Sequence, residues 1–246
     1  MPNQPDVLTQ LNDRKSVRVF QDRPIAPQER RQIITAALQA PTAGNQMLYT
    51  ILDIQSQEKK QRLARLCDNQ PFIAQAPLVL IFLADCRRWT DIYRAAGLEP
   101  RKPQYSDLIL ALADALIAAQ NTVVAAHALN LGSCYIGDIV EQHQEVTSLL
   151  TLDPWVVPAA MLVYGYPTEQ QIQRRKPPRF DPRYIVQTDS YSPLSETQIR
   201  QMFQERSGRD DFDFDHYIQG VYQRKHISEF ALEMARSVEI YLKAFA

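Results

Sequence analysis

Arg14-Lys15-Ser16-Val17-Arg18, near the start of the chain, places three cations and a hydroxyl within five residues. Each guanidinium can hold a phosphate through two parallel hydrogen bonds, and the hydroxyl adds a neutral donor. A solvated basic turn is the competing interpretation, because small charge clusters are common on protein surfaces. Composition alone favours the solvated turn, so a phosphate site needs support from the rest of the chain.

The rest of the chain has the composition of a soluble globular protein. Its 246 residues are 45% hydrophobic, and the formal net charge of -1 offers no field for collecting nucleic acid. Residues 1–6 are polar and unlike a secretion signal, and the longest apolar runs are about half the ~20 residues of a membrane span. Cys67, Cys86 and Cys134 are too scattered for a disulfide framework or a metal cage. We expect a cytoplasmic protein with no nucleic-acid partner, no membrane segment and no metal.

Apolar periodicity predicts one α+β domain. The continuous apolar run Pro77–Ala84 is typical of a central strand, and Ala159–Tyr166 of a second buried strand. Tyr49–Ile54 alternates like a half-buried strand. The other expected segments are helices at 26–40, 58–67, 195–204 and 228–246, an irregular surface excursion or lid at 86–106, and a basic, proline-rich loop at 173–191.

Ser106–Leu131 reads as one long helix that is apolar nearly all round. Some 22 helical residues at about 1.5 Å each would cross the whole domain. A helix of this kind must be buried on most sides, either inside the core or at a subunit interface.

An ordered set of short motifs resembles the nitroreductase family. Arg14–Arg18 is followed by Val19-Phe20, by Pro24-Ile25 and by the loop Ala40-Pro41-Thr42-Ala43-Gly44-Asn45-Gln46. The resemblance extends, with gaps, from Leu8 to Leu194 and is closest to the group of the major oxygen-insensitive nitroreductase and the NADPH-specific flavin reductase. It implies a mixed, mostly antiparallel sheet flanked by helices and an intertwined homodimer with two FMN at the interface. We expect a single domain over 1–246, with a divergent helical extension from about residue 195.

The same resemblance implies which residues bind FMN. Gln70 precedes a matching apolar run, and its amide suits the pyrimidine edge of a flavin. Asp138 departs from the family, so we expect only its backbone to face the ring, because a carboxylate there would oppose anionic reduced FMN. Lys15 stands where the group has Arg, which leaves a backbone contact as the alternative. The implied FMN residues are Arg14, Lys15, Ser16, Arg18, Thr42, Ala43, Gly44, Asn45, Gln70, Tyr135, Ile136, Gly137, Lys176 and Arg179.

Two of these assignments have open alternatives. The family's Lys-Pro-Arg element is shifted here, so Arg179 is the better candidate, and Arg174, Arg175 and Lys176 are possible substitutes. The competing interpretation is a solvated basic loop. For Thr42–Asn45, the competing interpretation is a loop that ends the preceding helix and has no contact with flavin.

The reaction implied is ping-pong hydride transfer, in which NADPH or NADH reduces FMN and a small-molecule oxidant then takes its place. Nitroaromatics, quinones and free flavin are the expected oxidants, and no side-chain acid or base is required. Arg209 and Arg236 are weaker candidates for substrate binding, since surface arginines are common. Two alternatives remain: a same-fold dehydrogenase or dehalogenase, and a flavin-binding sensor or storage module. The sequence does not select the oxidant or the nicotinamide cofactor.

The remaining acidic, histidine and cysteine positions do not predict a metal site or a catalytic residue. Asp211–His216 lacks the Gly and Glu of a calcium loop and reads as a solvated acidic turn. His127 reads as a hydrogen-bonded core histidine. Cys134 has no neighbouring His or basic residue in sequence to activate it as a nucleophile.

Overall fold

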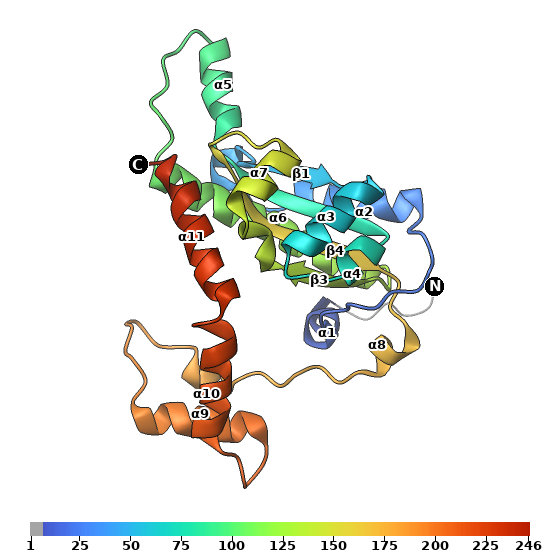
Figure 1. The fold of residues 1–246 in the computed structure, drawn as a ribbon, viewed down its shortest axis with the longest axis vertical. Helices are drawn as coiled ribbons and strands as arrows, with labels where there is room; N and C mark the ends of the chain where they lie inside the picture. The colour runs from blue at the N-terminus through green and yellow to red at the C-terminus, as the bar shows by residue number, and fades with distance from the viewer. Residues whose placement is uncertain (1–6) are drawn as a thin grey trace. The chain divides into compact units, whose positions relative to one another are not determined.

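The computed structural model describes residues 7–246, so the polar start, residues 1–6, lies outside the described chain. The chain forms two compact units, one comprising the residues up to Arg174 together with Glu233–Ala246, and the other comprising Arg175–Leu232. The expectation of one domain with an extension from about residue 195 stays a prediction. Figure 1 shows the elements of both units.

A four-stranded antiparallel sheet forms the centre of the first unit, in the order β1-β2-β4-β3. Its strands are β1 (Tyr49–Asp53), β2 (Leu78–Asp85), β3 (Gly132–Ile136) and β4 (Val156–Gly165). All eight residues of β2 are buried, which confirms the central strand. Helices cover both faces of the sheet, so the sequence of β2 is a continuous apolar run even though the strand is antiparallel. Outside these strands, Ser16 forms a parallel bridge with Ser133 at the edge of β3.

The helices mostly begin and end at capping or proline signals. In α2, Pro27 takes the first turn, and the Ala26 amide donates to Glu29 Oε2 at 3.0 Å. The first unit holds α1 (Val7–Asp13), α2 (Pro27–Leu38), α3 (Gln57–Leu66), α4 (Phe72–Gln75), α5 (Arg87–Ala95), α6 (Tyr105–Ala128), α7 (His143–Leu150) and α8 (Glu169–Gln173). The second holds α9 (Glu196–Ser207) and α10 (Phe214–Lys225), and α11 (Glu229–Lys243) belongs to both. Single 3-10 turns are η1 (Ala43–Asn45), η2 (Gly137–Val140) and η3 (Pro182–Tyr184).

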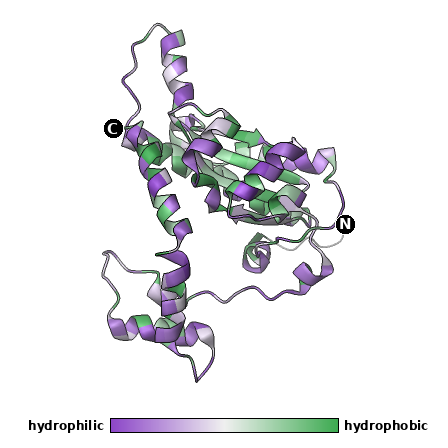
Figure 2. Ribbon diagram, viewed as in Figure 1, coloured by the Kyte–Doolittle hydropathy of each residue, from purple (hydrophilic) through white to green (hydrophobic). Residues whose placement is uncertain are grey.

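Helix α6 supplies much of the core. Its alanine-rich face, from Ala111 to Ala126, packs against α2, β2 and β4, and Figure 2 shows the apolar colouring concentrated on the sheet and this helix. Its opposite face leaves Ile109, Leu116 and Ile117 exposed. By length and composition α6 resembles a membrane span, but a core helix has the same properties. In a single chain α6 therefore has one buried and one exposed face, and its burial at a subunit interface stays a prediction.

Two expectations were wrong in part. Residues 86–106 contain helix α5, whose N-terminus is capped by Asp85 through the amides of Arg87 and Arg88. The predicted acidic turn is partly helical, since Asp213 accepts from His216 N at the start of α10. The sequence does not predict strand β3, because a five-residue strand with Gly and Ser carries little strand signal.

The second unit is held together by aromatic rings around one arginine. Phe203 packs edge-on against Phe180 and Phe214, and the Arg206 guanidinium lies 4.2 Å from the Phe180 ring centroid. Neither α9 nor α10 has a fully buried residue. This unit therefore has only a small core.

Candidate functional site

The basic segment lies along the edge of β3. Val17 is buried, and its amide donates to the Ser133 carbonyl at 2.9 Å. Gly132 makes this approach possible, because a Cβ at that position would lie 2.6 Å from the Val17 side chain. Backbone pairing thus fixes Arg14, Ser16 and Arg18 beside the start of β3.

The cations of this segment have the properties of an anion site. Arg14 has a buried Nη1 atom that makes no hydrogen bond to any of the residues described. Neither Arg14 nor Arg18 forms an ion pair with a carboxylate in residues 7–246. A buried, unsatisfied guanidinium donor is costly unless an anion fills the space.

Cys134 follows Ser133 in β3 and is buried. Its thiol donates to the Tyr135 carbonyl at 3.4 Å. Burial raises the pKa of the Cys134 thiol, although Arg18 and Ser16 oppose that shift. The raised pKa favours the neutral thiol. The expectation that Cys134 has no basic residue nearby was wrong, because Arg18 and Arg14 act on its thiol.

Lys15 is directed away from the other cations. Its ammonium donates to the Ile172 carbonyl at 2.6 Å and also to the Arg174 carbonyl. In return, the Arg174 guanidinium donates to the Ser16 carbonyl. Lys15 and Arg174 thus tie the basic segment to the end of α8, and this Lys15 contact was not expected from the sequence.

Gln70 meets Asp138 near the other end of β3. The Gln70 amide donates to the Cys67 carbonyl at 2.8 Å and to the Asp138 carboxylate. Both amide hydrogens are therefore used, and the Gln70 oxygen remains as an acceptor. The Asp138 carboxylate is directed at this amide.

The end of β3 offers an open surface between these groups. Gly137 is exposed, and a Cβ placed on it would meet nothing within 4 Å. Tyr135 donates to Gln120 Oε1 at 3.3 Å, and burial raises the pKa of its phenol to about 12. Ile136 is buried beneath. Four rises of about 3.4 Å separate Ser133 from Gly137, so cations and open surface lie about 14 Å apart along one strand.

The Thr42–Asn45 loop is strained, and a buried carboxylate holds it in place. Asp114 of α6 accepts from the Thr42 hydroxyl, from Ala43 N at 3.0 Å and from Leu48 N at 3.1 Å. Gly44, Asn45 and Met47 all have positive φ, at 55°, 58° and 50°. Left-handed backbone at Met47 persists only where contacts over-determine it.

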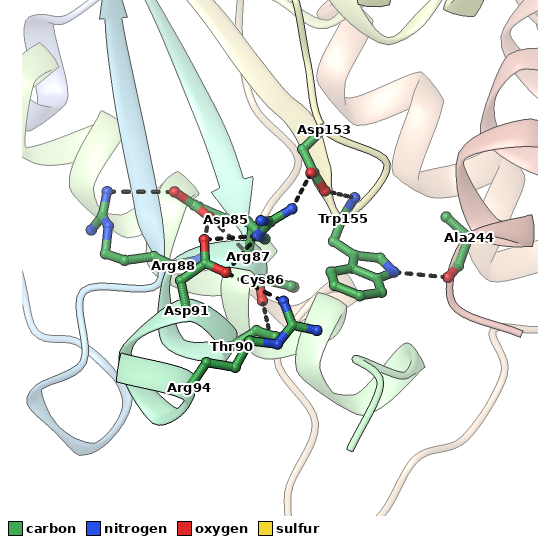
Figure 3. Close-up of polar contacts among 10 residues, drawn as sticks. All are labelled: Asp85, Cys86, Arg87, Arg88, Thr90, Asp91, Arg94, Asp153, Trp155 and Ala244. Atoms are coloured by element: carbon green, nitrogen blue, oxygen red, sulfur yellow. Dashed lines mark hydrogen bonds and ion pairs between the residues drawn. The ribbon is translucent and has the colours of Figure 1, made fainter. Parts of the chain in front are cut away.

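Helix α5 clamps the same loop from the other side. Arg88 donates to the Met47 carbonyl at 3.0 Å, and the Trp89 indole donates to the Gln46 carbonyl at 2.8 Å. Figure 3 shows Arg88 beside Asp85, which caps α5. Sequence reasoning missed Asp114, Arg88 and Trp89. A single carboxylate in the middle of an apolar helix was the signal for Asp114.

The two halves of the candidate site lie at opposite corners of the sheet. The Thr42–Asn45 loop leads into β1, whereas the basic segment pairs with β3, and these are the two outer strands. Three strand spacings put about 14 Å between them. The two corners are also separated along the strands. Tyr49 lies level with Val157 of β4, and Ser133 lies level with Tyr164 of β4. These two β4 residues are about 24 Å apart along the strand.

Three of the remaining candidates, Lys176, Arg179 and Arg209, belong to the second unit. The Arg209 guanidinium lies 5.9 Å from the Phe212 ring centroid. In the first unit, Arg236 binds Glu233 at 2.7 Å and Gln144 at 3.0 Å, so its guanidinium fixes α11 against α7.

Comparisons with known proteins place the chain in a family. The profile described as "Nitroreductase family" matches residues 11–166. An FMN reductase [NAD(P)H] of Bacillus subtilis is 28% identical over 95% of this chain and 99% of its own length. An oxygen-insensitive NADPH nitroreductase of Salmonella typhimurium is 31% identical over 74% of this chain and 73% of its own. The structure of NfrA2 from B. megaterium superposes with a TM-score of 0.77 at 27% identity, covering 94% of this chain and 96% of that one.

Proposed function

This chain belongs to the nitroreductase family, and on that premise we propose that it is an FMN-dependent oxidoreductase. It takes electrons from NADPH or NADH and passes them to a small organic oxidant such as a nitroaromatic, a quinone or free flavin. The similarity to an FMN reductase over almost its whole length supports the cofactor and the electron donor. When bound, FMN supplies the hydride chemistry.

The buried, unpartnered Arg14 Nη1 is the observation that carries the cofactor assignment. Arg14, Ser16 and Arg18 would hold the phosphate, because they offer two guanidinium groups and a hydroxyl, and no carboxylate within residues 7–246 pairs with either guanidinium. Gln70 would accept a hydrogen bond from the flavin ring through its free oxygen. Tyr135, Ile136 and Gly137 would form the surface between phosphate and ring. In this arrangement Lys15 positions the segment through its bonds to residues 172 and 174.

Thr42–Asn45 would serve the second copy in a homodimer. One bound FMN cannot extend from the Arg14 corner of the sheet to the Thr42 corner, because they lie on opposite outer strands and at opposite strand ends. A partner placed on the exposed face of α6 would bury Ile109, Leu116 and Ile117. Each FMN would then lie between the basic segment of one copy and the Thr42–Asn45 loop of the other.

The remaining assignments are proposals of the same kind. Arg179, with Lys176 beside it, would add a second cation for the FMN phosphate, and Arg209 would serve the nicotinamide cofactor. Arg236 would reach substrate only by giving up its bonds to Glu233 and Gln144. We place the protein in the cytoplasm, because its three cysteines are all free and buried.

The test is whether the purified protein is yellow and whether Arg14→Ala releases the colour. Losing a bidentate phosphate contact should cost about 1.5–3 kcal/mol, roughly one to two decades in FMN affinity. Arg31→Ala, an exposed arginine on α2, is the matched control and should retain the flavin. Absorbance and titration with FMN give the affinities, and NADPH with a quinone gives turnover. A colourless protein that binds no added FMN would contradict the proposal.

A further inference from the structure

A cavity of about 520 Å³ lies between α5, the loop 98–103 and the start of α6. This volume falls within the range of about 300–1,000 Å³ for small-molecule pockets. Two aromatic rings line it, Trp89 and Tyr93, whose centroids are 5.6 Å apart. Leu48, Leu98 and Leu110 add aliphatic walls. None of the residues assigned above to FMN lines this cavity.

The cavity is joined to the loop assigned to the partner's flavin. Gln46 and Leu48, which directly follow Thr42–Asn45, form part of its wall. The Trp89 indole donates to the Gln46 carbonyl at 2.8 Å, and the Leu48 amide donates to Asp114 at 3.1 Å. One wall of the cavity is therefore continuous with a rigidly held segment of the candidate site.

The charges of the lining disfavour an anionic ligand. Arg101 binds both oxygens of Asp107, at 2.6 and 2.9 Å, so these two charges cancel. Glu99 forms no ion pair with any residue in the described range 7–246, and the lining keeps one net negative charge. Burial raises the pKa of the Cys86 thiol to about 12, so this lining residue is neutral. Among the described lining residues, the pairing of Arg101 with Asp107 leaves no unpaired cation for a phosphate or carboxylate.

We propose that this cavity is a binding site for the aromatic part of the oxidant, selecting planar molecules that are neutral or positively charged. The faces of Trp89 and Tyr93 would stack on such a ring and attract a positive charge on it. Glu99, which is exposed, also attracts a positively charged ring and repels anionic aromatic molecules. This inference rests on the proposed function, because only that function makes the bound aromatic molecule an oxidant.

The two tryptophans of the chain provide the test. Trp155 does not line the cavity, and its indole donates to the Ala244 carbonyl (Figure 3). Trp155→Phe therefore leaves Trp89 as the only indole reporter, and Trp89→Phe is the matched control. The probes are 1-methylnicotinamide, nicotinamide and nicotinate, which share a ring but are cationic, neutral and anionic. We expect saturable quenching of Trp89 by the first two and about tenfold weaker binding of nicotinate.

Two lining variants, made in the Trp155→Phe protein, separate this site from quenching at a distance. Tyr93→Ala should weaken binding of both nicotinamide probes by about tenfold, since one stacking ring is lost. Glu99→Gln should reduce the preference for the cation over the neutral probe by about threefold. Tyr222→Ala, an exposed tyrosine of the second unit, should change nothing. Equal binding of the three probes, saturable quenching in Trp89→Phe, or no effect of Tyr93→Ala would overturn the proposal.

Flavin reduction by NADPH in the unmodified holoenzyme distinguishes the two proposals. If NADPH bleaches the flavin and no probe quenches Trp89 saturably, the cavity proposal fails and the function stands. If no bleaching occurs, the proposed function fails whatever the cavity binds. If NADPH bleaches the flavin and the probes quench Trp89 saturably, Tyr93→Ala should raise the KM for a neutral quinone by about tenfold.

Discussion

At the residue scale, the candidate site depends on positions with no direct role in chemistry. Asp114 holds the strained Thr42–Asn45 loop with three hydrogen bonds, and Gly132 lets Val17 approach β3. Both residues fix backbone, so their loss should be visible as altered flavin binding or altered stability. Each can be compared with a residue of the same type nearby.

Asp114→Asn should weaken FMN binding more than it weakens the fold. Asn keeps one acceptor oxygen but turns an NH2 group toward a backbone amide, at a cost of about 1–3 kcal/mol. We expect about tenfold weaker FMN binding, measured by flavin fluorescence far below the unfolding temperature. Asp107→Asn, on the same helix, is the control and should lower stability without changing FMN affinity. Equal effects of the two variants on FMN affinity would show that Asp114 has only a structural role.

Gly132→Ala should destabilise the protein, whereas Gly137→Ala should not. A Cβ on Gly132 would overlap the Val17 side chain, and overpacking of this kind costs about 1–3 kcal/mol. At Gly137 the added Cβ meets nothing, so a change within about 0.5 kcal/mol is expected. Urea unfolding gives both free energies. Val17→Ala should restore part of the loss in Gly132→Ala, and a lack of rescue would place the strain elsewhere.

At the element scale, two helices are fixed by polar contacts that sequence patterns do not reveal. Helix α5 is capped by Asp85 and holds the loop after Thr42 through the bond from Arg88 to the Met47 carbonyl. The C-terminal part of α11 is attached to α7, because Glu233 accepts from Gln142 N at 3.1 Å and from Ser237 Oγ at 2.8 Å. Phe245 and Tyr241 then bury its end beside Cys86.

The attachment of α11 should weaken in acid. Hydrogen bonds from Arg236, Ser237 and Gln142 N lower the pKa of Glu233 from 4.5 to about 2. A lowered folded-state pKa stabilises the protein above the unfolded value, and this stability disappears as the pH falls from about 4.5 toward 2. The free energy of unfolding should therefore differ between wild type and Glu233→Gln above pH 5, and the difference should shrink through that window. The exposed Glu239→Gln should track wild type at every pH, and a pH-independent difference for Glu233→Gln would contradict the account.

At the scale of the whole molecule, the sheet keeps the two halves of the site apart. Its outer strands carry the basic segment and the Thr42–Asn45 loop, and α6 exposes apolar residues along one face. Both observations support the proposed homodimer, in which a second copy would cover α6 and supply the other half of each site.

Ile117→Glu should therefore dissociate the dimer and release FMN together. Burying an unpaired carboxylate at an apolar interface costs several kcal/mol, so dimer affinity should fall by well over tenfold. Sedimentation velocity gives the mass, and absorbance of the same fractions gives the flavin content. Ile92→Glu, at an exposed position on α5, is the control. A stable yellow monomer would show that one chain holds FMN alone.

The sequence by itself determined the elements with strong local signals. The apolar period of Pro77–Ala84 and the capped helix beginning at Pro27 need only neighbouring residues, and the ordered motifs from Arg14 onward indicated the family. Helix α5, the hydrogen bonds of Asp114 and the pairing of Gln70 with Asp138 came only from the tertiary structure. These contacts join residues up to 72 positions apart. Local pattern fixes periodicity and caps, whereas only strand order and packing decide which distant side chains meet, and in this chain strand order also places Arg14 and Thr42 at opposite corners of the sheet.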